Sequence, residues 1–177
     1  MDRVGQALER FRRNHHCGAV LFIDLDNFKS ENNARGHDKG DILLQQVGER
    51  LKHSVRSSDT VARFGGDEFV LLLEEAGAGG EAAAQHAREV ADKILRAFEM
   101  PFDIDGVLHY SSPSVGVTII DRTSGSMEEV LKRADLAMYQ SKAAGCNTST
   151  WFEAGMEQRV AARAALEADL RQALNEG

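Results

Sequence analysis

A pair of glycines followed by two acids constrains the fold of this chain more than any other feature. Residues 65–68 read Gly-Gly-Asp-Glu, and the segments on both sides, 61–64 and 69–73, are short, mostly apolar and β-prone. Two adjacent glycines accept the positive φ angles of a two-residue hairpin turn. We therefore expect two carboxylates at the tip of a hairpin whose glycine backbone an anion can approach closely. An ordinary acidic surface hairpin would show the same pattern.

A second acidic segment lies earlier in the chain. Residues 19–23 form a continuous apolar run, typical of a buried central strand, and the run ends in Asp24, Leu25 and Asp26. If this strand lies beside the hairpin, Asp24 and Asp67 converge. Paired carboxylates and a backbone carbonyl are hard oxygen ligands, which suit Mg²⁺ and the phosphates of a nucleotide.

Residues 65–69 read Gly-Gly-Asp-Glu-Phe, and this chain resembles the GGDEF family of diguanylate cyclases over residues 19–151. The resemblance implies an α/β (α+β) fold with a mostly antiparallel central sheet flanked by helices, as in nucleotidyl cyclases and polymerase palms. The order of elements read from periodicity agrees: strand, two helices, hairpin, helix, strands, helix, strand. We expect the domain to span 1–153, including an N-terminal helix, and a helix over 154–177 to connect it to a further domain.

The resemblance implies a metal and phosphate site at the acidic segments. Asp24, the Leu25 carbonyl and Asp67 would hold Mg²⁺ (or Mn²⁺). The catalytic residues would be Asp67 as general base, Glu68 as its helper on the metal side, and Lys29 as a cation near the phosphates. Taken alone, Lys29 would be interpreted as a solvated charge on a helix.

The resemblance also implies a guanine pocket. Residues 24–32 match the family pattern Asp-x-Asp-x-Phe-Lys-x-x-Asn, but Asn33 replaces the usual Asp, and residues 36–41 match Gly-His-x-x-Gly-Asp. Asn32 and Asp41 would read the base. A carboxylate that faces N1–H and N2–H₂ of guanine rejects adenine, so we expect GTP. The substrate-binding residues would be Asn27, Phe28, Lys29, Asn32, His37, Asp41, Gly65, Gly66 and Lys142.

The local sequence suggests how the two helices near this pocket begin. Asp26 is placed to cap a short helix whose free N–H groups would face the end of the strand. Residues 36–41 are expected to form a turn before a long helix. In that reading Asp41 is equally consistent with a first-turn acid that complements the helix dipole.

Arg56 and Asp59 precede the hairpin at the spacing of the family's product-inhibition site. The tetrapeptide carries no signal by itself, because Arg and Asp bracket many loops. In the context of the family, a guanidinium can bind phosphate and stack on a purine, and Asp59 can accept from guanine. The resemblance thus implies a second site for cyclic di-GMP, to which Arg88 could add a contact.

A late helix is expected over 126–144. Ser126 provides its cap, Glu129 completes a capping box, and Gly145 ends it. By resemblance, Lys142 on this helix would reach the GTP phosphates. Cys146 stands where the family normally has Arg, which we expect one helical turn beyond Lys142, so the exchange predicts weaker GTP binding.

The family's reaction condenses two GTP into cyclic di-GMP and pyrophosphate. One chain would hold one GTP half-site, so turnover would need a homodimer. The alternative is a GTP-binding regulatory module, weak or silent as a catalyst, that controls an attached EAL-type phosphodiesterase. The departures at Asn33 and Cys146 and the connector-like residues 166–174 favour this alternative.

Composition limits the partners. The net charge of −7 argues against binding a nucleic acid polymer through a basic face. Two cysteines, Cys17 and Cys146, show no metal-ligand spacing and suit a reducing compartment. No apolar stretch has the length of a membrane span, and no signal peptide pattern precedes the first strand. We therefore expect a cytoplasmic domain without direct membrane insertion, tethered to a membrane only through other segments.

Overall fold

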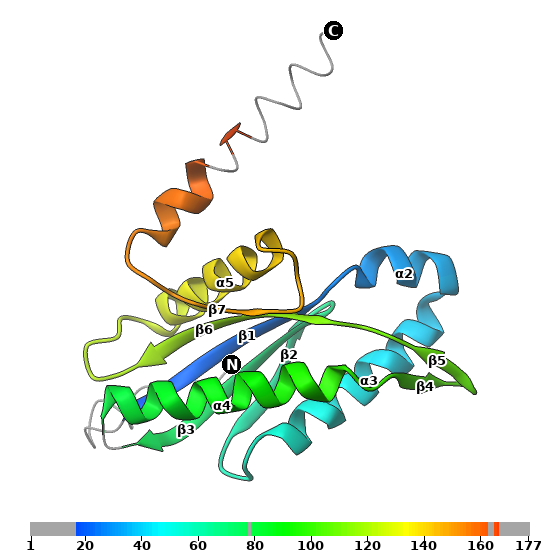
Figure 1. The fold of residues 1–177 in the computed structure, drawn as a ribbon, viewed down its shortest axis with the longest axis horizontal. Helices are drawn as coiled ribbons and strands as arrows, with labels where there is room; N and C mark the ends of the chain where they lie inside the picture. The colour runs from blue at the N-terminus through cyan, green and yellow to red at the C-terminus, as the bar shows by residue number, and fades with distance from the viewer. Residues whose placement is uncertain (1–16, 78, 163–164, 167–177) are drawn as a thin grey trace, which may run out of the picture.

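The computed structural model describes residues 17–77, 79–162 and 165–166, which form a five-stranded sheet with helices on both faces (Figure 1). The sheet strands are β1 (Cys17–Leu25), β2 (Thr60–Gly65), β3 (Glu68–Gly77), β6 (Pro113–Ile120) and β7 (Ser149–Trp151), in the spatial order β2-β3-β1-β6-β7. The pairings are antiparallel except that of β6 with β7. The expected fold class is confirmed.

Four helices and a small hairpin complete the described elements. The helices are α2 (Phe28–Arg35), α3 (His37–Ser54), α4 (Gly80–Phe98) and α5 (Met127–Ala143), and the hairpin joins β4 (Phe102–Ile104) to β5 (Val107–His109). Residues 156–162 and 165–166 are also helical. The helix expected before residue 17, and the rest of the helix expected over 154–177, lie outside the described residues.

Strand β1 occupies the centre of the sheet because both of its faces are apolar. Leu21, Ile23 and alternate neighbours pack into one cluster with α3 and α4. Val20 and Phe22 pack into a second cluster, which α5 covers. A strand buried on both faces needs a continuous apolar run, and this explains the sequence of residues 19–23.

Helix α5 packs directly on β6 at Gly116. A Cβ atom at this position would collide with the Ala134 carbonyl oxygen and the Met138 backbone nitrogen. The end of α5 is fastened as well, since Ser141 Oγ lies 2.8 Å from the Val115 carbonyl oxygen and 2.8 Å from Thr150 Oγ1. These contacts fix where the last turn of α5, and therefore Lys142, meets the sheet.

The hairpin turn between β2 and β3 differs from the expectation by one residue. The turn residues are Gly66, with φ +51°, and Asp67, whereas Gly65 ends β2 and pairs with Glu68. A bulge at Phe64 adds a residue to β2, and this moves the turn toward Asp67. Arg63 Nε donates to the Gly66 carbonyl oxygen at 2.8 Å and braces the turn.

Two expected helix starts are wrong. The residue before α2 is Asn27, in a left-handed conformation with φ 60°, so Asp26 does not cap that helix. Helix α3 begins at His37 immediately after Gly36, so residues 36–41 are not a turn and Asp41 lies in the second helical turn. The cap of α5 is as expected, because Ser126 Oγ accepts from the Glu129 backbone N–H at 3.2 Å.

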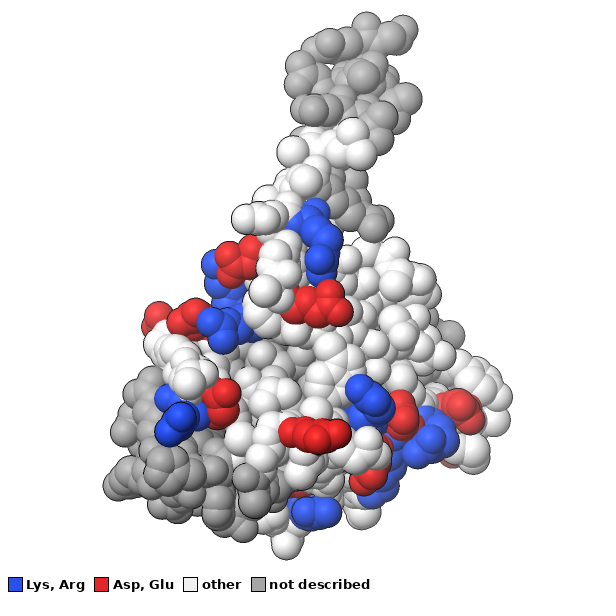
Figure 2. All heavy atoms as spheres, turned by 60° about the vertical axis from the view of Figure 1, so that its left-hand side comes forward, with Lys and Arg blue, Asp and Glu red and all other residues white. Residues whose placement is uncertain are grey.

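The charged side chains on one face of the molecule are mixed in sign. In Figure 2, Lys and Arg side chains alternate with Asp and Glu, and among the described residues this face shows no continuous basic patch. None of the described helices is both long enough and apolar enough to traverse a bilayer.

Candidate active site

Three segments distant in sequence meet at one edge of the sheet. The register places Asp24 at the end of β1 opposite Glu68 at the start of β3. The Leu25 backbone N–H donates to the Asp67 carbonyl oxygen at 3.4 Å, so the turn lies against the end of β1. From α5, Lys142 Nζ lies 2.6 Å from Asp24 Oδ1. The expected convergence of Asp24 with the acidic turn is therefore present.

The Leu25 carbonyl faces the acidic turn rather than β6. In an antiparallel strand the N–H and C=O of one residue point to the same side, and the Leu25 N–H points toward Asp67. On the other side, Leu25 pairs with Pro113, which has no N–H to donate. The Leu25 carbonyl oxygen therefore lies on the side of the acidic turn and is not used in pairing with β6.

The carboxylates of this edge are held partly out of water. Burial raises the pKa of Asp24, which is 6% exposed; Lys142 opposes the shift and the charge of Asp67 adds to it. Burial also raises the pKa of Glu68, with further repulsion from Asp24 and from Asp135 on α5.

This donor set fits a divalent cation. Two carboxylates, a backbone carbonyl and the repulsion between neighbouring acids favour a bound positive charge. In the structure, the Lys142 ammonium group supplies one positive charge beside Asp24.

Asp26 is equally buried but has a different role. Its carboxylate accepts hydrogen bonds from Ser112 Oγ and Ser114 Oγ, each at 2.6 Å, and from the Asn147 backbone N–H at 3.1 Å. These bonds join the end of β1 to the segment before β6 and to the loop after α5. Our sequence reasoning missed this function; the available signal was the pair of serines on either side of Pro113.

Cys146 does not continue the helical face of Lys142. Helix α5 ends at Ala143, Gly145 has φ +118°, and Cys146 itself has φ 66°, so the expected one-turn spacing is wrong. The thiol lies 3.8 Å from the Lys142 carbonyl oxygen. Burial raises the pKa of the Cys146 thiol, with Asp26 as a further cause, so the group is a neutral thiol at neutral pH.

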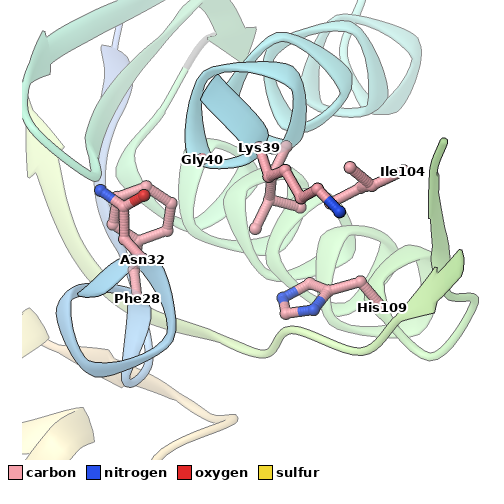
Figure 3. Close-up of a pocket in the computed structure, with 7 residues that line it drawn as sticks. Phe28, Asn32, Lys39, Gly40, Ile104 and His109 are labelled. Carbon is pink, nitrogen blue, oxygen red and sulfur yellow. The ribbon is translucent and has the colours of Figure 1, made fainter. Parts of the chain in front are cut away.

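A small pocket lies between α2, the first turns of α3 and the β4–β5 hairpin (Figure 3). Its volume is about 240 Å³, and it is lined by Phe28, Asn32, Lys39, Gly40, Leu43, Ile104 and His109. The Asn32 side-chain amide lies directly over Gly40, so a Cβ atom there would force this amide to move. This volume includes open solvent, so the pocket is a shallow depression between the three elements rather than an enclosed cavity.

The predicted base-reading residues are only partly brought together. Phe28 and Asn32 line the pocket, but Asp41 is exposed and lies outside the lining. Asn27 and Lys29 are exposed near the end of β1. The side chain of His37 lies outside the described part of the chain. No local pattern indicated the lining residues Ile104 and His109, because the β4–β5 hairpin reaches this pocket only through tertiary packing. Lys39, within the segment 36–41, was not singled out either.

The predicted product site lies at the other end of β2. Arg56 is exposed, while the Asp59 carboxylate accepts from the backbone N–H of Arg56 at 2.9 Å and of Glu74 at 3.1 Å. Asp59 thus stabilises the loop that contains it, and its carboxylate oxygens can still accept further hydrogen bonds from a ligand. The six residues of β2 separate this loop from the acidic turn by about 17 Å. Arg88 lies over the Trp151 ring, 5.5 Å from its centroid.

Comparison with known proteins identifies the family of this chain. Residues 1–148 match the family model described as "Diguanylate cyclase, GGDEF domain". The bifunctional diguanylate cyclase/cyclic di-GMP phosphodiesterase MucR of Pseudomonas aeruginosa is 40% identical over 173 residues, which are 98% of this chain and 24% of MucR. The chain therefore spans about a quarter of the length of this relative.

Solved structures agree with the fold. A structure of TpbB from Pseudomonas aeruginosa comprising only the GGDEF domain superposes with a TM-score of 0.81 at 32% identity, covering 90% of each chain. An EAL/GGDEF domain protein from M. capsulatus superposes with a TM-score of 0.74 at 39% identity, covering 86% of this chain and 95% of that one. With the family match over most of its length, the chain belongs to the GGDEF family of diguanylate cyclase domains.

Proposed function

We propose that this domain condenses two GTP molecules into cyclic di-GMP and pyrophosphate. The observation that supports it most is the convergence of Asp24, the Gly66–Asp67 turn and Lys142 at one sheet edge. That edge lies at the end of β1, from which the chain passes directly into α2, whose Phe28 and Asn32 line the neighbouring pocket. The relative MucR, whose name includes diguanylate cyclase, is consistent with this chemistry.

Different residues of this edge would bind the metal ion and the triphosphate. Asp24, the Leu25 carbonyl and Asp67 would hold Mg²⁺ (or Mn²⁺), whose bound charge lowers the pKa of a hydroxyl and offsets developing phosphate charge. Lys142 and Lys29 would neutralise the triphosphate, Lys142 by exchanging its contact with Asp24 for one with phosphate. Gly65 and Gly66 leave the turn backbone open to the phosphates.

In the reaction, the 3′-hydroxyl of one GTP attacks the α-phosphate of the other, and the bond to pyrophosphate breaks. We assign the hydroxyl proton to Glu68 rather than to Asp67. Glu68 faces Asp24 across the strand pair, and burial raises its pKa, which suits a proton acceptor. Asp67 then remains a ligand.

Substrate recognition and control use the remaining predicted residues. Asn32 and Asp41 would read the guanine edge, with Phe28 against the base and His37 at the start of α3. Arg56 and Asp59 would bind cyclic di-GMP at the separate product site. One chain supplies one catalytic edge, so two chains would meet face to face as a homodimer.

A second candidate is a regulatory module that binds GTP without turnover and controls an attached EAL-type phosphodiesterase. One observation favours it: a neutral thiol, Cys146, stands where the family normally has an arginine. The helical residues after β7 would then transmit the signal to the attached domain.

One experiment separates the candidates. The purified protein is incubated with GTP and Mg²⁺, product is followed by chromatography, and GTP binding is measured by calorimetry. A cyclase forms cyclic di-GMP at a rate per chain that rises with protein concentration, as a dimer requires. Binding without product supports the regulatory module. Absence of GTP binding would contradict both.

A further inference from the structure

The loop that follows Lys142 has an unusual backbone. Three consecutive residues after α5 have positive φ angles: Gly145 at +118°, Cys146 at 66° and Asn147 at 47°. Glycine tolerates this conformation, but other residues seldom adopt it, and two in succession persist only where their surroundings hold them. Backbone of this kind is concentrated at functional sites. The contacts that hold the loop therefore indicate what its shape serves.

One set of contacts joins the loop to the last turn of α5. The Gly145 backbone N–H donates to the Lys142 carbonyl oxygen at 3.2 Å, and the Cys146 backbone N–H donates to the Ser141 carbonyl oxygen at 3.2 Å. These carbonyl groups lie at the helix end, where no further helical turn supplies donors. The loop therefore holds the backbone of Lys142 in helical geometry, and a change in the loop would release it.

The far end of the loop is anchored by Asp26. The Asn147 backbone N–H donates to Asp26 Oδ2 at 3.1 Å, and this side chain is 6% exposed. Ser112 Oγ donates to Oδ2 and Ser114 Oγ donates to Oδ1, each at 2.6 Å, so the carboxylate is itself fixed. A hydrogen bond to an ionised acceptor is stronger than one between neutral groups. Asp26 thus provides a firm acceptor that stabilises the positive-φ conformation.

The end of β1 contacts the Lys142 segment in two ways. Lys142 Nζ lies 2.6 Å from Asp24 Oδ1, while Asp26, two residues further along the chain, holds the loop after Lys142. In the proposed function a phosphate replaces Asp24 as the partner of the ammonium group. The contact through Asp24 is then lost, whereas the contact through Asp26 remains. Asp26 can therefore hold the lysine backbone while the side chain binds substrate.

We propose that Asp26 is a positioning residue that holds the end of α5, through the Asn147 backbone N–H, so that Lys142 presents its ammonium group to the triphosphate of bound GTP. The inference rests on the proposed function, because it takes Lys142 as a phosphate-binding residue. It gives Asp26 a part in substrate affinity in addition to its part in joining segments of the chain.

The test measures binding of α,β-methylene-GTP in the presence of Mg²⁺ by calorimetry. The methylene bridge prevents release of pyrophosphate, so binding is measured without turnover. Asp26→Ala should weaken binding about tenfold, the effect of one hydrogen bond to a charged group. Asp26→Asn should bind nearly as tightly as the wild type, because its amide oxygen can accept from the Asn147 N–H and its amide nitrogen can donate to Ser114. Equal losses in the two variants would show that Asp26 acts through its charge, and would overturn the inference.

Ser114→Ala is the matched control. It removes the bond to Oδ1 but leaves the bond from Asn147 to Oδ2, so it should lower the thermal midpoint and keep the wild-type affinity. A double-mutant cycle tests whether Asp26 acts through the lysine. In a Lys142→Met background, Asp26→Ala should cause no further loss of affinity, because the side chain that it positions is absent. A second tenfold loss in that background would mean general damage to the site and would overturn the inference.

A measurement on the wild type decides the matter even if Asp26→Ala fails to fold. Energetic coupling is reciprocal, so saturation with α,β-methylene-GTP should slow hydrogen exchange of the Asn147 amide about tenfold, as followed by NMR. The same ligand should not slow this exchange in Lys142→Met. Binding with unchanged exchange in the wild type would overturn the inference alone. A wild type that does not bind this nucleotide would contradict the proposed function, and the inference with it.

Discussion

Asp24 and Asp26 are two residues apart at the end of the same strand and are both 6% exposed, yet their surroundings differ. Asp26 has three hydrogen-bond donors at its carboxylate. Asp24 faces one lysine and several acids, and burial raises its pKa. A carboxylate whose oxygens accept several hydrogen bonds from the protein holds segments of the chain together. A carboxylate that accepts few such bonds can bind an external cation. Burial alone does not distinguish the two, but the count of donors does.

The largest expected effect tests the role of Asp24. Asp24→Asn and Asp67→Asn each remove an anionic ligand and should lower cyclic di-GMP formation by more than about a hundredfold, comparable to losing one preorganised electrostatic partner of a transition state. The thermal midpoint should stay close to that of the wild type, because Asn is isosteric. Asp92→Asn, an exposed change on α4, should leave the rate unchanged. A rate near wild type in either variant would refute the metal assignment.

The next effect concerns stability. Asp26→Ala leaves two hydroxyls and a backbone N–H without their acceptor and should lower the free energy of unfolding by about 3 kcal/mol. Asp24→Ala should lower it far less, since it removes a desolvated charge. Urea denaturation of both variants measures the difference. Equal losses would mean that Asp24, too, is mainly structural.

A smaller effect is expected at the lysine that faces Asp24. Lys142→Met should weaken GTP binding by about 1.5–3 kcal/mol, the range for a hydrogen bond to a charged group. Lys132→Met is the control: Lys132 is on the same helix, is 62% exposed and pairs only with the exposed Glu157 among the described residues. If both variants bind GTP like the wild type, Lys142 does not reach the phosphates.

The smallest effect concerns pH. Burial raises the pKa of Asp135 in the folded chain above the ordinary value of 3.8. The contribution of Asp135 to the free energy of unfolding is therefore most favourable below pH 3.8, where the group is protonated in both states. That contribution is lost as the pH rises through the raised pKa. Asp135→Asn should therefore gain stability relative to the wild type between pH 3 and pH 7. The gain should be about 0.5 kcal/mol, because Asp135 is only partly removed from water and solvent screens its charge.

Asp121→Asn provides a control of opposite sign. Burial tends to raise the pKa of Asp121, but hydrogen bonds from Thr123 and Ser124 outweigh it and lower the pKa. The contribution of Asp121 to the free energy of unfolding is present above the ordinary pKa of an Asp and is lost as the pH falls through the lowered pKa. This variant should therefore lose stability at pH 7 and approach the wild type at low pH. If the stability differences between the wild type and the two variants changed with pH in the same direction, these assignments would be contradicted.

The sequence predicted those features that depend on local pattern. The apolar run of 19–23 specified a central strand, Ser126 and Glu129 specified the start of α5, and the two glycines specified a hairpin. The failures have tertiary causes. The bulge at Phe64 moved the turn, and the loop after Ala143 removed the expected spacing to Cys146.

Other features were beyond any local signal. The hydrogen bonds of Asp26 and the burial of His109 both depend on segments that are distant along the chain. The close approach of α5 at Gly116 is a further case, because only the packed structure shows which backbone atoms a side chain there would meet.

The bond between Asp26 and Asn147 spans 121 residues and has a consequence for biosynthesis. Strand β1 is made early, but both of its neighbours in the sheet, β3 and β6, come from much later segments. Such long-range pairing slows folding, because the chain loses loop-closure entropy before the stabilising contacts form. A ribosome must release α5 and the following loop before Lys142 can meet Asp24. A truncated nascent chain therefore lacks the assembled acidic edge, and if the proposed function holds, nucleotide binding would report completion of the domain during translation.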